Sequence, residues 1–247
     1  MNDLSKKITE ILNHSINKFD RPVNELIKEL KIELEKQYAD FNYWDDLEVS
    51  NPGKYNQFDE IANQTGHSLD IQKREDIESA MFIEDELFAL IEMKIIYAFK
   101  HLEINIKKMI RHYYNELPTS KPKWHEIERF FKRQNISLNK IQGFQEVDEL
   151  RLVNNSLKHS HDNIDQSIMK IEEFKNGSIQ SFETLDKFYE RIEDFPALFF
   201  TSLMEIIEKE TSDFNQKKLE QIAEKATNRM NKDNAEKLII EIRNKYK

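Results

Sequence analysis

The stretch Glu149–Ser160, ELRLVNNSLKHS, gathers nitrogen-bearing side chains whose types could act on a phosphodiester. They are Arg151, Asn154, Asn155, Lys158 and His159. An imidazole, with an unperturbed pKa of about 6.5, moves a proton near neutral pH, whereas Arg and Lys hold anions and Asn amides donate and accept hydrogen bonds. Together these groups could perform general acid–base chemistry at a phosphate without a metal ion.

A helical conformation would place these side chains on one side of the segment. With about 100° between successive residues, Asn155 and Lys158 lie within about 40° of Arg151, and Asn154 and His159 flank that group. The opposite arc holds the apolar residues Leu150, Leu152, Val153 and Leu157. Any amphipathic helix has a solvated polar face, so an ordinary surface stays an open alternative. Two consecutive Asn and a Ser lower helix propensity, however, so something other than helix formation favours them here.

The composition predicts the kind of elements that position this segment. Among 247 residues there are only four glycines and five prolines, whereas 34% are charged and 16 are phenylalanine. So few turn-forming residues are poorly suited to the many tight turns of a β-sandwich or barrel. The predicted fold class is therefore all-α, a helical bundle with additional N- and C-terminal helices.

Apolar residues that recur every three or four positions predict the individual helices. The strongest pattern runs from residue 74 to 115 and places Leu87, Ile91, Leu102 and Ile106 on one buried stripe. In contrast, residues 40–70 show no sustained period and are predicted to form a long connection with at most one short helix. The other predicted helices cover residues 4–18, 23–39, 123–135, 145–160 and 165–175, 181–210 with a kink near Pro196, and two charged helices within 214–247.

Charge and cysteine content narrow the classes of function. The chain has no cysteine, which excludes disulfides, thiolate zinc sites and a cysteine nucleophile. With no signal-peptide pattern and no apolar run near the ~20 residues of a membrane span, we expect a cytoplasmic protein without a membrane association. The net charge is −9, yet residues 100–160 hold 12 Lys/Arg against 7 Asp/Glu, which permits a phosphate-bearing partner there.

The segment containing Asn154, Asn155, Lys158 and His159 resembles the signature helix of the HEPN superfamily. These all-α domains include metal-independent ribonucleases of toxin–antitoxin and phage-defence systems, and their motif is an arginine, a polar residue and a histidine a few positions later. The resemblance implies a homodimer whose signature helices form a shared cleft for RNA. It further implies that His159 transfers the proton, Arg151 stabilises the phosphorane charge and Asn155 orients one of them, with Asn154 and Lys158 binding substrate.

A second pair supports the resemblance, because HEPN domains often carry Glu-x-x-x-Lys on an earlier long helix. Glu103 and Lys107 have this spacing, which places them side by side on one helix face and makes them further candidates for substrate binding. The same spacing is common on ordinary helices. The predicted organisation is an N-terminal helical extension and connection over residues 1–75, a HEPN-like bundle over 76–210 and charged C-terminal helices over 211–247.

Other candidate sites have weaker sequence support. His101 and His112 share a helix face but have no third ligand at metal-binding spacing, so neither a metal nor another cofactor is predicted. Trp124, Phe130 and Phe131 lie among five basic residues and could stack bases, although core packing with a basic rim fits them better.

Three functional hypotheses follow. The first is a metal-independent endoribonuclease acting in antiviral defence or as a toxin. Whether the chain is an enzyme stays open, because its motif departs from that of the family. If Arg151 is the motif arginine, seven residues separate it from His159, and the apolar Leu152 follows it where the motif has a polar residue. If Asn155 is instead the polar residue of the motif, the uncharged Asn154 takes the position of the arginine. The second hypothesis is therefore an inactive HEPN-like domain that binds RNA or a partner protein of a defence system, and the third is a structural adaptor.

Overall fold

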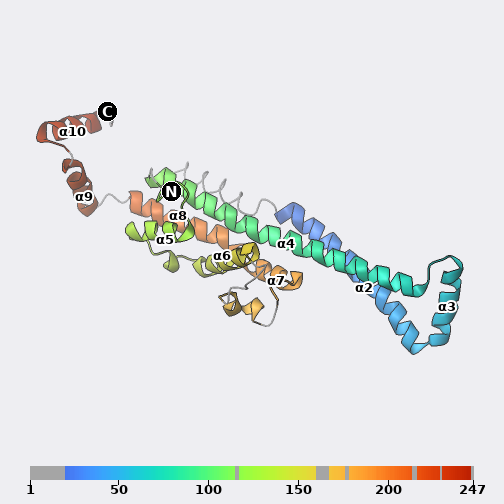
Figure 1. Ribbon diagram of the computed structural model, residues 1–247. Coiled ribbons are helices and arrows are strands. Elements are labelled where there is room, and N and C mark those ends of the chain that lie inside the picture. Colours follow the sequence, from blue (N-terminus) through green and yellow to red (C-terminus); the bar gives the residue numbers. More distant parts are fainter. Residues whose placement is uncertain are drawn as a thin grey trace. The chain divides into compact units, whose positions relative to one another are not determined.

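The computed structural model describes residues 20–114, 117–159, 167–175, 178–212, 216–228 and 230–245. Helices make up its regular secondary structure, and no strand occurs in these ranges (Figure 1). The predicted all-α bundle is confirmed. The chain divides into two compact units, Met1–Met204 and Glu205–Lys247.

The connections between the helices of the described ranges differ in length, from one residue to 22 residues. The helices are α2 (Asp20–Ser50), α3 (Pro52–Gln64), α4 (Leu69–Tyr114), α5 (Trp124–Arg133), α6 (Phe144–His159), α7 (Phe182–Ile192), α8 (Phe195–Ser212), α9 (Gln216–Thr227) and α10 (Lys232–Lys245). Three short 3₁₀ turns, η1 (Leu138–Lys140), η2 (Ile168–Lys170) and η3 (Glu172–Phe174), flank α6 in the sequence.

The long helix α4 forms the centre of the first unit. Its predicted apolar stripe is buried, because Leu87, Ile91, Ile95, Leu102 and Ile106 are each 0% exposed. The helix packs against α2, α6 and α7, and α2 runs beside its N-terminal part in Figure 1. At about 1.5 Å per residue, 46 residues extend over about 69 Å, so α4 contacts elements that are far apart in the sequence.

The predicted connection over residues 40–70 is wrong, because α2 continues to Ser50 and α3 follows immediately. Asn51 caps α3, since its side chain accepts a hydrogen bond of 3.1 Å from the backbone N–H of Lys54. Pro52 occupies the first helical position, where a missing N–H costs nothing. These residues begin a helix here and do not mark a loop, and the predicted boundary between residues 75 and 76 falls within α4.

Other predicted elements differ in detail. The single kinked helix over 181–210 is two helices, because α7 ends at Ile192 and α8 begins at Phe195, with Pro196 in its first turn. The helix predicted over 165–175 is replaced by the turns η2 and η3 in its described part. The two charged C-terminal helices are confirmed as α9 and α10, and residues 4–18 lie outside the described ranges.

Gly143 determines how the chain enters α6. Its φ is +81°, and a Cβ there would lie 3.1 Å from the Phe195 carbonyl oxygen and 3.3 Å from Phe199 Cβ. We expect Gly143→Ala to lower the free energy of unfolding by about 2 kcal/mol, because left-handed strain and a clash with α8 add together. Gly66→Ala is the matched control in chemical denaturation, since Gly66 has φ +80° and no atom near its added Cβ. Equal losses in the two variants would contradict the clash.

Candidate functional site

The helix α6, which carries the candidate motif, lies in the first unit and packs against α4, α7 and the turn η1. Leu150 and Val153 are 0% exposed, so the predicted apolar arc faces the core. Leu157, near the C-terminal end of α6, lines a cavity of about 690 Å³ together with Glu84, Phe88 and Glu92 of α4. The end of α6 that carries the motif is therefore close to this central part of α4.

Arg151 is held by a carboxylate of its own helix. Its Nε donates to Asp148 Oδ1 at 2.8 Å, and its Nη2 lies 2.7 Å from the same oxygen. The side chain is 25% exposed. An anion that recruits this guanidinium would have to compete with Asp148 for it.

Asn154 is not on the solvated face, so its expected placement there is wrong. It is 1% exposed, its Nδ2 donates to Asn155 Oδ1 at 3.2 Å, and its buried Oδ1 has no hydrogen-bond partner among the described residues. On the helical wheel Asn154 adjoins Leu150 and Leu157. Because α4, α7 and η1 all pack against α6, the buried side of this helix is wider than the arc of its apolar residues and includes Asn154. Asn154 therefore presents almost no surface to solvent, and its role in substrate binding stays a prediction.

Asn155 and Lys158 do lie on the exposed side of α6. His159 is the last residue of α6, and its side chain lies outside the described part of the chain. Besides Arg151 and Asn154, the candidates on this helix are thus the exposed Asn155 and Lys158, in the last turns of α6, and His159 at its end.

Glu103 and Lys107 form the ion pair that their spacing predicts, with Lys107 Nζ donating to Glu103 Oε1 at 3.0 Å. Both side chains are 25% exposed. The part of α4 beside Leu157 ends near Glu92, and eleven residues of helix extend about 16 Å, so the pair is roughly three turns farther along. Among the described residues, no hydrogen bond or ion pair joins Glu103 or Lys107 to Asn155 or Lys158.

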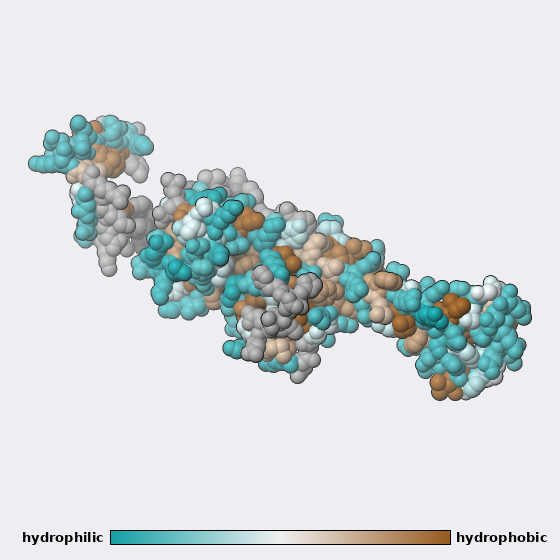
Figure 2. Space-filling model, viewed as in Figure 1, coloured by the Kyte–Doolittle hydropathy of each residue, from teal (hydrophilic) through white to brown (hydrophobic). Residues whose placement is uncertain are grey.

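A basic groove is present at α5 instead. We use "basic groove" for the cavity of about 470 Å³ lined by Pro118, Thr119, Glu126, Arg129, Lys132 and Arg133. Among the residues that the structure describes, none of the three cations forms an ion pair. Figure 2 shows mostly hydrophilic atoms over α5, and the surrounding stretch, residues 100–133, carries nine Lys/Arg against four Asp/Glu.

Glu126, the carboxylate among the residues that line the groove, caps the N-terminus of α5. Glu126 Oε2 accepts a 2.7 Å hydrogen bond from the Lys123 backbone N–H at the start of α5. This bond lowers the pKa of Glu126 from its ordinary value, so the carboxylate is charged and caps the helix. Trp124, Phe130 and Phe131 are buried, which confirms that these aromatics pack in the core beneath a basic rim.

A buried lysine that the sequence pattern did not indicate lies between α2, α4 and α7. Lys94 is 4% exposed, its Nζ donates to Asn24 Oδ1 at 2.7 Å, and it lies 4.3 Å from the centroid of the Tyr189 ring. The Tyr189 hydroxyl donates to Asp20 Oδ2 at 2.8 Å. Burial raises the pKa of Asp20, while Tyr189 and Lys94 oppose that rise. Lys94 interrupts an apolar stripe of α4, and the spacing of the apolar residues alone does not indicate that a lysine among them is buried.

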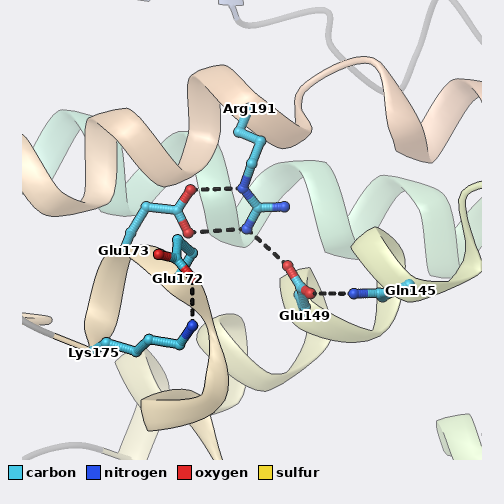
Figure 3. A network of polar contacts seen from close by, with 6 residues as sticks. All are labelled: Gln145, Glu149, Glu172, Glu173, Lys175 and Arg191. Atoms are coloured by element: carbon cyan, nitrogen blue, oxygen red, sulfur yellow. Dashed lines mark hydrogen bonds and ion pairs between the residues drawn. The ribbon is translucent and has the colours of Figure 1, made fainter.

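Arg191 joins α6 to two other elements (Figure 3). Its guanidinium donates to both carboxylate oxygens of Glu173 in η3, at 2.6 and 3.0 Å, and to Glu149 Oε2 of α6 at 2.8 Å. Gln145 donates to the other oxygen of Glu149 at 3.1 Å. Although burial acts in the opposite direction, the bonds from Arg191 lower the pKa of Glu173. The network fixes the outer side of α6.

We expect Arg191→Met to lower the free energy of unfolding by about 1 kcal/mol at pH 7, a value discounted because the side chain is 36% exposed. Since the folded pKa of Glu173 is depressed, its contribution is present above the unfolded pKa of about 4.5 and is lost as the pH falls through the folded value. The deficit should therefore shrink in acid. Urea denaturation at several pH values measures it, with the exposed Lys187→Met on the same helix as control.

The comparisons with known proteins leave the family open. No family model, no curated protein and no solved structure matches the chain. Within the described residues, no helix is long and apolar enough to cross a membrane, and no cluster of three potential metal ligands occurs.

Proposed function

We propose that this chain is an RNA-binding helical domain of the HEPN type, which contacts the phosphate backbone through the basic groove. The observation that carries the proposal is the set of three cations, Arg129, Lys132 and Arg133, which line one concave surface without an ion pair in the described part of the protein. Unpaired cations along a groove match the charge of a single-stranded backbone. Arg133 lies 5.9 Å from the Phe130 ring centroid, which limits the freedom of its guanidinium.

The state of the motif residues favours binding over cleavage. Catalysis at phosphorus needs a cation that is free to stabilise the developing charge, but Arg151 is paired with Asp148. Asn154, which occupies the arginine position in the alternative register, is buried and uncharged. A domain that holds RNA without cutting it needs neither group at the reacting phosphate.

A metal-independent endoribonuclease in phage defence or a toxin system is the second candidate. It is favoured by the exposure of Asn155 and Lys158 on the turn of α6 that ends with His159. A homodimer that pairs the signature helices would complete such a site, as the resemblance implies. A partner protein of a defence system would then regulate it.

Two measurements on the purified chain separate these candidates. Fluorescence anisotropy with a single-stranded RNA should show binding whose log K falls linearly with log salt, and no binding at moderate salt would contradict the first proposal. Incubation of the RNA with EDTA then tests cleavage. Loss of cleavage in His159→Ala with unchanged binding would establish the ribonuclease, whereas binding without any cleavage supports the RNA-binding domain.

A further inference from the structure

The helix α10 presents an apolar stripe on its surface. Leu238, Ile239 and Ile242 are 39%, 50% and 49% exposed, and Ala235 completes the same side at helical spacing. None of the 14 residues of α10 is buried. A helix of this length is marginal in water without packing, so a partner surface on this stripe would stabilise it. Figure 2 shows hydrophobic atoms between hydrophilic ones on α10.

The neighbouring helix α9 extends the apolar surface of the second unit. Leu219 and Ile222 of α9 are 47% and 46% exposed. Both helices therefore leave large apolar side chains in water, whereas the first unit buries most of its own. A second copy of the chain would supply an equal surface, and symmetric pairing of identical patches is the commonest form of self-association.

Charges on the flanks of the α10 stripe distinguish between the possible pairings. At about 100° per residue, Glu236 and Arg243 lie on one flank of the stripe, and Glu241 lies on the other. Lys245 follows Glu241 by four residues, the spacing at which a helix places an ammonium beside a carboxylate. The flanks therefore differ in charge pattern, and each pairing brings a different set of charges together.

In an antiparallel pair, equal flanks of the two helices meet. A two-fold axis between residues 239 and 240 then places Glu236 of one copy opposite Arg243 of the other, and the reverse pair repeats on the far side of the axis. In a parallel pair, opposite flanks meet, so that Glu236 approaches Glu241 of the second copy. The first arrangement gives two attractive pairs and the second gives repulsion.

We propose that α10 pairs antiparallel with α10 of a second copy of this chain, so that the C-terminal helices form a dimer interface. The stripe of Leu238, Ile239 and Ile242 is the buried seam, and Glu236 and Arg243 specify the direction of the partner helix. This interface lies outside α6 and the basic groove, and it does not depend on RNA binding.

Sedimentation velocity on the full chain tests the direction of pairing. Glu236→Arg should weaken the dimer about tenfold, because it places two cations opposite each other at both pairs. The double variant Glu236→Arg/Arg243→Glu should restore wild-type association, since the opposite charges meet again. A stronger dimer in Glu236→Arg would point to parallel pairing, and an unchanged dimer would point to another surface; either result, or a monomer at all concentrations, overturns the proposal.

Cysteine placement gives an independent test, because the natural chain has none. Ile239→Cys puts a thiol in the seam near the two-fold axis, so mild oxidation or a short bismaleimide should link two copies. Ile240→Cys is the matched control, since Ile240 is 55% exposed, close to the 50% of Ile239, but lies on the other side of the helix. Equal cross-linking of both variants, or of neither, would contradict the antiparallel seam. Circular dichroism of each variant confirms that the helices are intact.

Discussion

Replacing Arg129, Lys132 and Arg133 together by Gln should weaken binding to single-stranded RNA by about 10- to 100-fold near 0.15 M salt. The three side chains line the basic groove and have no ion pair among the described residues, so their removal takes charge from the surface without breaking an ion pair. The contact between the Arg133 guanidinium and the Phe130 ring is lost with it. Each lost phosphate contact also reduces counterion release. The slope of log K against log salt should therefore become shallower by about two for a single strand.

The control carries the same change in net charge at a different place. Arg74, Lys170 and Lys187 are exposed cations outside α5, and their combined replacement by Gln should leave affinity within about twofold. Anisotropy titrations at three salt concentrations measure both variants. Equal weakening in the two would mean that overall charge, and not the groove, governs binding.

Replacing Lys94 by Met should lower the free energy of unfolding by about 3 kcal/mol at pH 7, which corresponds to a melting temperature roughly 10 °C lower. The ammonium is 4% exposed and interacts with Asn24, the Tyr189 ring, Asp20 and Glu193. A Met side chain fills a similar volume but leaves the two carboxyl groups without a compensating charge. The loss is therefore electrostatic, with little change in packing.

The pH dependence of this loss follows from the direction of the pKa shifts. Burial raises the pKa of Asp20 and of Glu193, and Lys94 opposes both shifts. Without Lys94 the folded pKa values rise further, so the folded state binds more protons than the unfolded state and gains stability as the pH falls. The deficit of Lys94→Met should therefore be smaller at pH 5 than at pH 7.5.

Thermal and urea denaturation at the two pH values measure this effect. Lys100→Met is the matched control, because Lys100 is on the same helix and exposed, with its Nζ 5.2 Å from the Tyr97 ring centroid. It should change the free energy of unfolding by less than about 0.5 kcal/mol. A deficit in Lys94→Met that is independent of pH would show that packing, and not charge compensation, makes this lysine important.

The sequence by itself determined the fold class and most of the helices. Few glycines and prolines, with apolar residues at helical spacing, predicted the α4 core stripe, α5, α6 and the charged pair α9 and α10, all of which are observed. These features depend on local propensity and on a single period, which the chain carries at each position. The prediction failed over residues 40–70 because the apolar residues there show no sustained period, although Asn51 and Pro52 begin a helix.

Only the tertiary structure decided which polar groups are accessible. A helical wheel gives the direction of a side chain but not the number of elements that cover it. Asn154 was therefore expected on the solvated face and Lys94 was not singled out, whereas both side chains are buried. Likewise, the spacing of Glu103 and Lys107 predicted their ion pair, but their distance along α4 from the end of α6 depends on how the two helices pack. Burial and long-range proximity come from several segments at once, and no single stretch of the sequence contains them.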